Sequence, residues 1–551
     1  MTGAPAFSPL DDANFNQSPI FQDVNLFTLD GPLQDAVNRA GANTKALAQF
    51  GRTWGYSLTF EDGRLANENP PKLRTSDAKG HRLDLVEFHP SYHALMTRST
   101  TTGLHCSAFE GDDEREPAAV SARAARQYMA VGVEAGHMCP ITMTHAAIPV
   151  LKTQAPADLR ERVLPLLVKR KYDSRPLPWF EKDAITVGMG MTERQGGTDV
   201  RANTTRAEHS GGEARITGHK WFMSAPMCDA FLVLAQGEGG LSCYFLPRHR
   251  PDGQPNGLRF RRLKPKLGNH SNASSEVEFF DAHAVPLGAP GRGVATIIEM
   301  VQWTRLDCAV SSAGLMRMAL AEAIQHVRHR AVFQRKLVDQ PAMRAVLADM
   351  ALELEAIVAL VFRLTQAFDR KDVSPADAAY ARLMTPVVKY LVCKRAPAFI
   401  YEAMECLGGN GYVEELPLAR LYREAPLNAI WEGSGNVMAL DMLRAFARQS
   451  DDAAAVVADL FRAASDVDRD LGGLAAKLNH AIRSGEAETR ARATAETLGK
   501  IAAVAALAEA RSSAASRYAR IRLLGLPSMF YGSANIDTAD ADQLIDRAFQ
   551  A

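Results

Sequence analysis

The chain has 551 residues, of which 47% are apolar and 23% are charged. This length suggests two to four structural units, and the composition is typical of globular proteins. The 63 basic residues equal the 63 acidic residues in number. No overall field therefore favours a nucleic acid or a membrane surface, although this balance still permits a local basic patch.

Targeting signals and metal-binding patterns are not evident in the sequence. The seven cysteines are scattered without a CxxC pair, which favours reduced, buried thiols over a zinc ribbon or a redox pair. The N-terminal residues lack a basic start and an apolar core, and no apolar run is long enough to cross a bilayer. His326 and His329 lack a supporting carboxylate and indicate a solvated helix face. We expect a cytoplasmic protein without a membrane segment or a metal site.

The chain order is an arm, helices, a small β domain, and then helices to the end. The arm contains isolated Phe15, Phe21 and Phe27, which we expect to dock on another element or another subunit. Helical apolar spacing marks residues 120–134 and 157–169. The predicted segments are an arm (1–40), a helical domain (41–184), a β domain (185–287), a helical bundle (288–447) and an extra helical domain (448–551).

The β domain is predicted from short runs that are rich in β-branched and aromatic residues and are separated by GG, DG and Pro turns. We expect these strands to form a small antiparallel domain within a mainly α protein. After it, Leu320, Ile324, Val327 and Ala331 follow a helical period and predict one buried face. The predicted strands are 214–224, 230–235, 242–246, 258–263 and 276–280.

Several common nucleotide and hydrolase motifs are missing. The GxG pairs at 188–190 and 291–293 lack the third glycine and the βα context of a dinucleotide fingerprint. Neither a GxxxxGK[ST] loop nor a GxSxG elbow occurs. A Rossmann fold, an NTPase and an esterase of that type are therefore not expected.

Four other segments combine residue types that suit a planar, charged cofactor, although each also has a plain structural reading. MTERQGGTD (191–199) offers backbone N–H groups and hydroxyls, or is a simple turn. GHKWFMS (218–224) ends a strand with aromatics and a hydroxyl, or is a core strand. Arg330 can hold a pyrophosphate, or be a solvated helix residue. Glu432, in IWEGSGN, is a candidate base, or a helix-capping acid.

Taken in this order and spacing, the segments resemble the acyl-CoA dehydrogenase family over roughly residues 45–445. The resemblance implies that fold, bound FAD, and removal of an α-proton from an acyl-CoA by Glu432. It also implies that the R-x-x-F motif, which here runs from Arg330 to Phe333, reaches the FAD of a neighbouring subunit. The protein would then be at least a dimer, and members of the family are commonly tetramers. The cofactor-binding residues that it implies are Met191, Thr192, Gly197, Thr198, Phe222, Ser224, Arg330, Phe333, Gln340, Gly408, Gly409, Ile430, Trp431, Gly433 and Asn436.

The chain departs from the family pattern in three places. Phe222 replaces the usual Trp, and Gln334 replaces the usual Gly after the R-x-x-F motif. Some members carry their base just before an Arg-Leu pair, where this chain has Thr304. Because Thr cannot act as that base, Glu432 is the base that the resemblance supports.

Within the family, the chain is more similar to an AidB-like subgroup than to ordinary chain-length-specific dehydrogenases. The similarity lies in the arm, the extra C-terminal domain and the phrases MTERQGGTDV and NAIWEGSGN. That resemblance implies weak dehydrogenation of a short or branched acyl-CoA. As the alternative, it implies a flavin-containing DNA-binding protein of the alkylation-damage response. Residues 451–551 contain 12 basic and 14 acidic residues, which does not favour DNA binding. The best local cluster is Arg511, Arg517, Arg520 and Arg522, which do not share one helix face.

Overall fold

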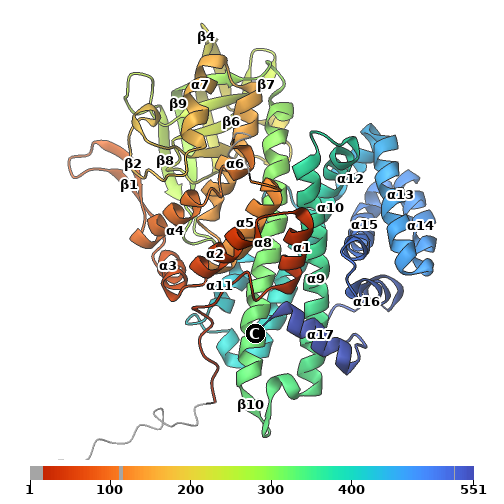
Figure 1. The fold of residues 1–551 in the computed structure, drawn as a ribbon. Coiled ribbons are helices and arrows are strands. Elements are labelled where there is room, and N and C mark those ends of the chain that lie inside the picture. Colours follow the sequence, from red (N-terminus) through yellow and green to blue (C-terminus); the bar gives the residue numbers. More distant parts are fainter. Residues whose placement is uncertain (1–15, 111–115, 527, 551) are drawn as a thin grey trace, which may run out of the picture.

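The structure is a computed structural model that describes residues 16–110, 116–526 and 528–550. Three long helices, α8 (Gly293–His329), α9 (Pro341–Arg370) and α10 (Pro375–Leu407), form its centre (Figure 1). The N-terminal helices and the β domain lie on one side of this bundle, and the C-terminal helices lie on the other. Among the described helices, none is long and apolar enough to span a membrane.

The N-terminal domain confirms the predicted helices, since α5 (Ala119–Val133) and α7 (Ala157–Leu167) lie within two residues of the predicted ranges. It also contains an unpredicted two-stranded hairpin. Those strands are polar and largely exposed, so they lack a clean apolar alternation. The other elements are α1 (Gly31–Ala40), α2 (Thr44–Trp54), α3 (Ser57–Glu68), β1 (Lys72–Ser76), β2 (Arg82–Glu87), α4 (Pro90–Thr101) and α6 (Met138–Gln154).

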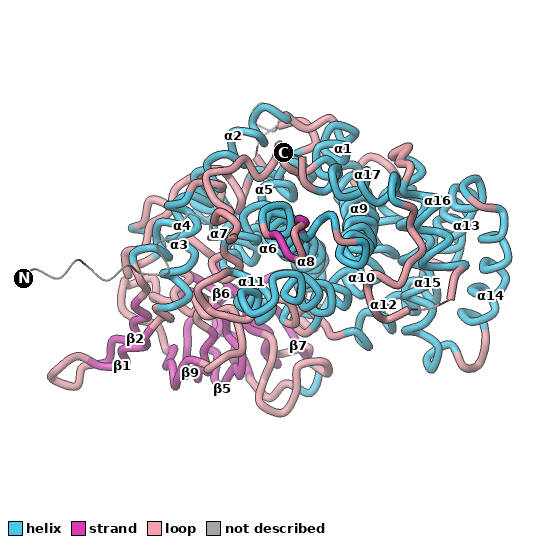
Figure 2. The backbone as a smooth tube through the Cα atoms, turned by 90° about the horizontal axis from the view of Figure 1, so that it is seen from below, coloured by secondary structure: helices cyan, strands magenta, loops and turns pink. Residues whose placement is uncertain are grey.

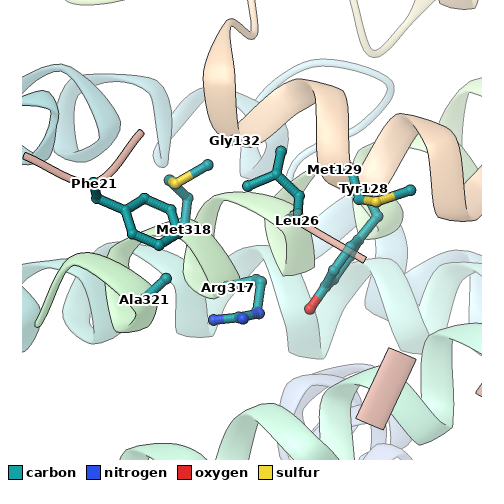
Figure 3. Close-up of a pocket in the computed structure, with 9 residues that line it drawn as sticks. Phe21, Leu26, Tyr128, Met129, Gly132, Arg317, Met318 and Ala321 are labelled. Atoms are coloured by element: carbon teal, nitrogen blue, oxygen red, sulfur yellow. The ribbon is translucent and has the colours of Figure 1, made fainter. Parts of the chain in front are cut away.

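The described part of the N-terminal arm packs on its own chain. Phe21 and Phe27 are both buried, and Phe15 lies outside the described residues. Figure 3 shows Phe21 beside Met318 of α8 at a small cavity. Arg317, which also lines this cavity, donates to the Asp30 carboxylate at 2.7 Å. Burial of the apolar arm residues against α5 and α8 is the driving force for this docking.

Five strands of the β domain pair in a closed ring. The strands are β3 (Val187–Gly190), β4 (Arg206–Ser210), β5 (Glu213–Ser224), β6 (Ala230–Gly237), β7 (Gly240–Pro247), β8 (Leu258–Leu263) and β9 (Ser274–Leu287). The chain of pairings β6–β4–β5–β9–β7 returns to β6, while among the described residues β3 pairs only with β6 and β8 only with β9. The five predicted strands are confirmed; β3 and β4 were not predicted. β3 is half glycine and β4 is mostly exposed, so neither shows strand periodicity, and β3 pairs with β6 in parallel.

Helix α8 ends earlier than its apolar period predicts. Leu320, Ile324 and Val327 are buried as expected, but the helix ends at His329. Ala331 belongs to a two-stranded hairpin, β10 (Ala331–Val332) and β11 (Arg335–Lys336). The R-x-x-F motif therefore lies on a hairpin that projects from the end of the bundle (Figure 1), instead of on a helix and the following turn.

The end of the C-terminal domain packs next to the first helix of the chain. Its last helix, α17, packs on α9 and next to α1, and Gln550 N donates to Leu29 O (Figure 2). The N-terminal arm and the C-terminal helix thus support each other against the central bundle. The remaining elements are α11 (Pro417–Glu424), α12 (Gly435–Arg448), α13 (Ser450–Val467), α14 (Gly472–Arg483), α15 (Ala487–Glu509), α16 (Ala514–Ala519), a π-turn (Arg520–Leu524) and α17 (Thr538–Ala548).

Candidate active site

Glu432 lies in the short connection before α12, with its backbone in the left-handed region (φ 58°). Such a conformation is unfavourable for a non-glycine residue, and surrounding contacts must hold it. Arg305 of α8 donates to Glu432 O at 3.0 Å, and Lys389 of α10 donates to Gly433 O at 2.9 Å. Two buried cations therefore fix the backbone that aims this side chain.

The Glu432 carboxyl has the properties of a general base. Its Oε2 is buried and has no hydrogen-bond partner in the described part of the chain. Burial raises the pKa of Glu432 above its ordinary value, while Thr304, Arg305 and Lys389 oppose that rise. A carboxylate with a raised pKa and a free oxygen can accept a proton near neutral pH. Thr304 lies beside the Glu432 carboxyl. The two positions at which members of the family carry their base, 304 and 432, are therefore neighbours in the fold.

The sequence did not indicate several polar groups that lie around Glu432. The Cys139 thiol of α6 lies near Glu432, Ser224 and Lys266, and burial raises its pKa to about 12. Lys266 donates to Asn272 O, and Ser274 Oγ lies 3.2 Å from Ser224 Oγ. Cys139 comes from α6, Lys266 and Asn272 from the loop between β8 and β9, and Ser274 from the start of β9, and only the tertiary fold brings them together.

The loop of the MTERQGGTD segment is organised by its glutamate. Glu193 is fully buried and pairs with the equally buried Lys220 at 2.8 Å. It also accepts from the backbone N–H groups of Thr204 and Thr205. Lys220 outweighs the effect of burial and lowers the pKa of Glu193 to about 2. This residue is therefore structural: it anchors the loop.

The predicted cofactor residues of this loop lie beside the end of β5. Thr192 O accepts from Trp221 N at 2.8 Å, and Asn203 donates to Met191 O. Gly197 and Thr198 are exposed at the tip of the loop. A Cβ on Gly197 would lie 2.9 Å from Thr192 Oγ1, so a larger residue would displace that side chain. Backbone groups are thus accessible to a ligand here.

Phe222 is half exposed on β5, close to this loop. The Lys264 ammonium lies 3.5 Å from the Trp221 ring centroid and 4.6 Å from the Phe222 centroid. Such cation–π contacts hold the aromatic pair in place. Ser224 lies near Cys139, and Cys139 lies near Glu432, so the buried Cys139 links the end of β5 to the candidate base. We call the loop at 191–198, residues 222–224, Cys139 and Glu432 the Glu432 site.

The residues on either side of Glu432 complete that site. Trp431 Nε1 donates to Asn428 Oδ1 at 3.0 Å, which orients the indole ring. Ile430 and Asn436 are exposed, and Gly433 has φ 103°, a conformation that favours glycine. The structure therefore brings together the predicted residues of segments 191–198, 222–224 and 430–436.

The other predicted cofactor residues lie at the far end of the bundle. Thr304 and His329 are 25 positions apart on α8, which corresponds to about 37 Å at 1.5 Å per residue. Phe333 and Gln334 form the turn of the hairpin, both with positive φ (48° and 63°) as a two-residue turn of type I′ requires. Phe333 is 91% exposed. Within one chain, this hairpin does not meet Glu432.

The turn that begins with Gly408 and Gly409 lies near the hairpin, and residues of the N-terminal arm contact both. Asn16 Nδ2 donates to Ala331 O and Asn16 Oδ1 accepts from Ala331 N, both at 2.8 Å. Arg330 donates to Asn16 O at 2.9 Å. Asn410, within the turn that begins with exposed Gly408 and Gly409, donates to Gln17 at 3.1 Å. We call this group the hairpin cluster.

Gln340 and His326 also lie at this end of the bundle. Gln340 donates to Val332 O at 3.2 Å, so it supports the hairpin from within. His326 is buried, not solvated as predicted, and its Nδ1 lies 3.3 Å from Ser18 Oγ of the arm. In the described ranges, no three His, Cys, Asp or Glu side chains gather closely enough to hold a metal ion.

Two of the four arginines predicted as a DNA-contact cluster make strong internal ion pairs. Arg522 pairs with Asp349 and Glu353 of α9, and Arg517 pairs with Asp540 of α17. Arg520 is largely exposed, 3.6 Å from a carboxylate, and Arg511 is exposed after α15. The positive charge of the set is thus partly neutralised within the chain.

Comparison with known families follows the division seen in the fold. Residues 16–174 match the family described as the adaptive response protein AidB N-terminal domain. Residues 188–282 match the acyl-CoA dehydrogenase middle domain, and residues 291–447 match the acyl-CoA dehydrogenase C-terminal domain. The chain belongs to the acyl-CoA dehydrogenase family.

Individual relatives point to the AidB branch of that family. The chain is 52% identical to the putative acyl-CoA dehydrogenase AidB of Escherichia coli over 439 residues, which is 79% of this chain and 80% of the relative. The fold is similar to Caenorhabditis elegans ACDH-11 in complex with C11-CoA, with a TM-score of 0.82, 26% identity and coverage of 100% and 95% of the two chains. It is also similar to the apo-form of Bd2924, with a TM-score of 0.81, 29% identity and coverage of 90% and 100%.

Proposed function

We propose that this protein is an FAD-dependent dehydrogenase that introduces an α,β double bond into a short or branched acyl-CoA, with Glu432 as the base. The observation that carries this proposal is the Glu432 carboxylate, which presents a buried oxygen with no hydrogen-bond partner among residues 16–110, 116–526 and 528–550. Its raised pKa suits proton removal from a carbon next to a thioester carbonyl. The subgroup resemblance supports a short or branched acyl chain and a low rate.

The residues of the Glu432 site fit FAD. Backbone groups of the loop at 191–198 are accessible, and Phe222 offers a half-exposed ring for stacking on a planar group. Ser224, two residues after Phe222 on β5, lies near Cys139. When bound, FAD supplies the acceptor for the hydride that leaves the β-carbon.

The chain's own residues would provide orientation and proton transfer. Glu432 takes the α-proton on its buried oxygen. Burial around Thr304, Cys139 and Cys308 keeps water away from that carboxyl. The backbone contacts from Arg305 and Lys389 hold the direction of the side chain during the reaction.

The distance between the Glu432 site and the hairpin cluster supports a homo-oligomer. Because about 37 Å separates them along α8, Arg330 and Phe333 would complete the cofactor site of a second copy. The large exposure of Phe333 fits such a contact. We therefore propose at least a dimer, and by family resemblance a tetramer. The buried, free cysteines of the described residues fit a cytoplasmic protein.

Anaerobic mixing of the oxidised protein with a panel of acyl-CoAs tests the proposal. A substrate should bleach the flavin in the wild-type protein. Glu432→Gln should still bind FAD but reduce the flavin about 10²- to 10⁴-fold more slowly, whereas Glu415→Gln, an exposed control, should behave as wild type.

Two outcomes would count against this proposal. Unchanged reduction in Glu432→Gln would remove this residue from its role. Absence of bleaching by every acyl-CoA, together with DNA binding that falls steeply with salt, would favour the DNA-binding alternative.

A further inference from the structure

Lys389 is a buried cation beside the candidate base, and among the described residues no carboxylate forms an ion pair with it. Its side chain is 1% exposed. In the described part of the chain, its ammonium donates to two carbonyl oxygens, Asn428 O and Gly433 O, both at 2.9 Å. An ammonium that is held only by carbonyls keeps its full charge in a medium where electrostatic interactions are strong. Such a buried charge is costly and demands an explanation.

The other cation near Glu432 is compensated. Arg305 pairs with Asp441 of α12 at 2.7 Å, and Arg382 shares the same carboxylate at 3.2 Å. Arg305 therefore has a carboxylate partner, which it shares with Arg382. Lys389 is the cation near Glu432 whose charge is not balanced in this way among the described residues.

The two carbonyls that Lys389 contacts flank Glu432 in the sequence. Asn428 precedes it by four residues and Gly433 follows it, so one ammonium closes the loop that carries the base. Asn428 is itself held by Ser312 of α8 and by Trp431. A single side chain of α10 thus connects the loop to the central bundle.

We propose that Lys389 is a positioning residue for the dehydrogenation: it holds the Glu432 loop in its left-handed conformation and keeps the carboxylate ionised. This inference rests on the proposed role of Glu432. The groups that face the carboxyl from the elements packed on it are Arg305, Thr304 and Cys308 of α8, Lys389 of α10 and Cys139 of α6. Burial raises the pKa of both thiols, so they stay neutral. The charges that oppose the rise in the pKa of Glu432 are Arg305, which shares Asp441 with Arg382, and Lys389.

The test is the pH dependence of flavin reduction by the best acyl-CoA, measured with the FAD-loaded protein. Lys389→Gln keeps a donor toward the carbonyls but removes the charge, and Lys389→Met removes both. Since the lost charge favours the protonated acid, the acidic limb of the profile should move upward by about 1 pH unit in either variant. Lys389→Arg should restore the wild-type limb. Lys477→Met, at an exposed lysine of α14, is the matched control.

The outcomes separate this inference from the proposed function. A wild-type acidic limb in a folded, FAD-loaded Gln or Met variant overturns the role of Lys389. The same holds if the Arg variant, which keeps the charge, shifts as far as the Gln variant. If the Gln and Met variants do not fold, the Arg variant decides: a wild-type limb supports the charge role, and a shifted limb overturns it. Failure of Glu432→Gln to slow reduction would instead refute the proposed function itself.

Discussion

Replacing Arg522 should loosen the C-terminal domain from the central bundle. The Arg522 side chain is 13% exposed and contacts two carboxylates, Asp349 and Glu353, that are each 1% exposed. Burial alone would raise the pKa of Glu353, but Arg522 and Arg395 outweigh it and leave that pKa below its ordinary value. Removal of the guanidinium would therefore leave two buried acids, one of which keeps Arg395 at 3.6 Å.

The expected loss follows from this geometry. Breaking one partner out of a buried ion pair costs about 3–5 kcal/mol, because an uncompensated charge remains. Arg395 and protonation of Asp349 relieve part of that cost, so we expect Arg522→Met to lose about 3 kcal/mol. Arg520→Met is the matched control. Arg520 is 73% exposed and lies 3.6 Å from Asp468, and an exposed pair is worth about 0–1 kcal/mol.

Amide hydrogen exchange measures this loss locally, since a chain of several domains does not unfold in one step. Arg522→Met should speed exchange in α16 and the π-turn that follows by about 100-fold, since each 1.4 kcal/mol corresponds to a factor of ten. Exchange in the β domain should not change. Equal effects of the Arg522 and Arg520 variants would refute the argument. Loss of DNA binding without any change in exchange would restore Arg522 to the DNA-contact prediction.

Two further predictions concern the cofactor sites. The folded-state pKa of Glu193 is lowered to about 2, so the stability from its pairing with Lys220 is present above pH 4.5 and is lost as the pH falls toward 2. Amide hydrogen exchange in β5 and β6 should show that Glu193→Gln destabilises the β domain by up to about 3 kcal/mol at pH 7 relative to wild type. This difference should close below pH 4, and the exposed Glu208→Gln should show no difference. Asn16→Ala removes both hydrogen bonds to Ala331 and should weaken FAD retention about fivefold at a cost of about 1 kcal/mol, measured by flavin release on dilution. Unchanged retention, or an equal effect of the exposed control Asn38→Ala, would exclude a role of the arm in cofactor binding.

Much of the architecture could be predicted from local patterns. The strands of the β domain with strong apolar content, such as 230–237, were found because they lie between clear turns. The polar strand 206–210 and the glycine-rich strand 187–190 were missed, since strand pairing and not side-chain pattern makes them strands. The apolar period of α8 ran into Ala331, because an alanine fits a helical face and a hairpin equally well.

Motif spacing along the chain was enough to predict the family and to single out a candidate base. It could not predict what surrounds that base. Cys139 and Lys389 come from elements far apart in the sequence and lie near Glu432, and Lys266 lies near Cys139. The same holds for Arg522. The sequence suggested an exposed arginine, but in the fold it pairs with two buried carboxylates of α9. Local patterns encode helices and strands, whereas burial and charge pairing depend on contacts between elements, and those exist only in the folded chain.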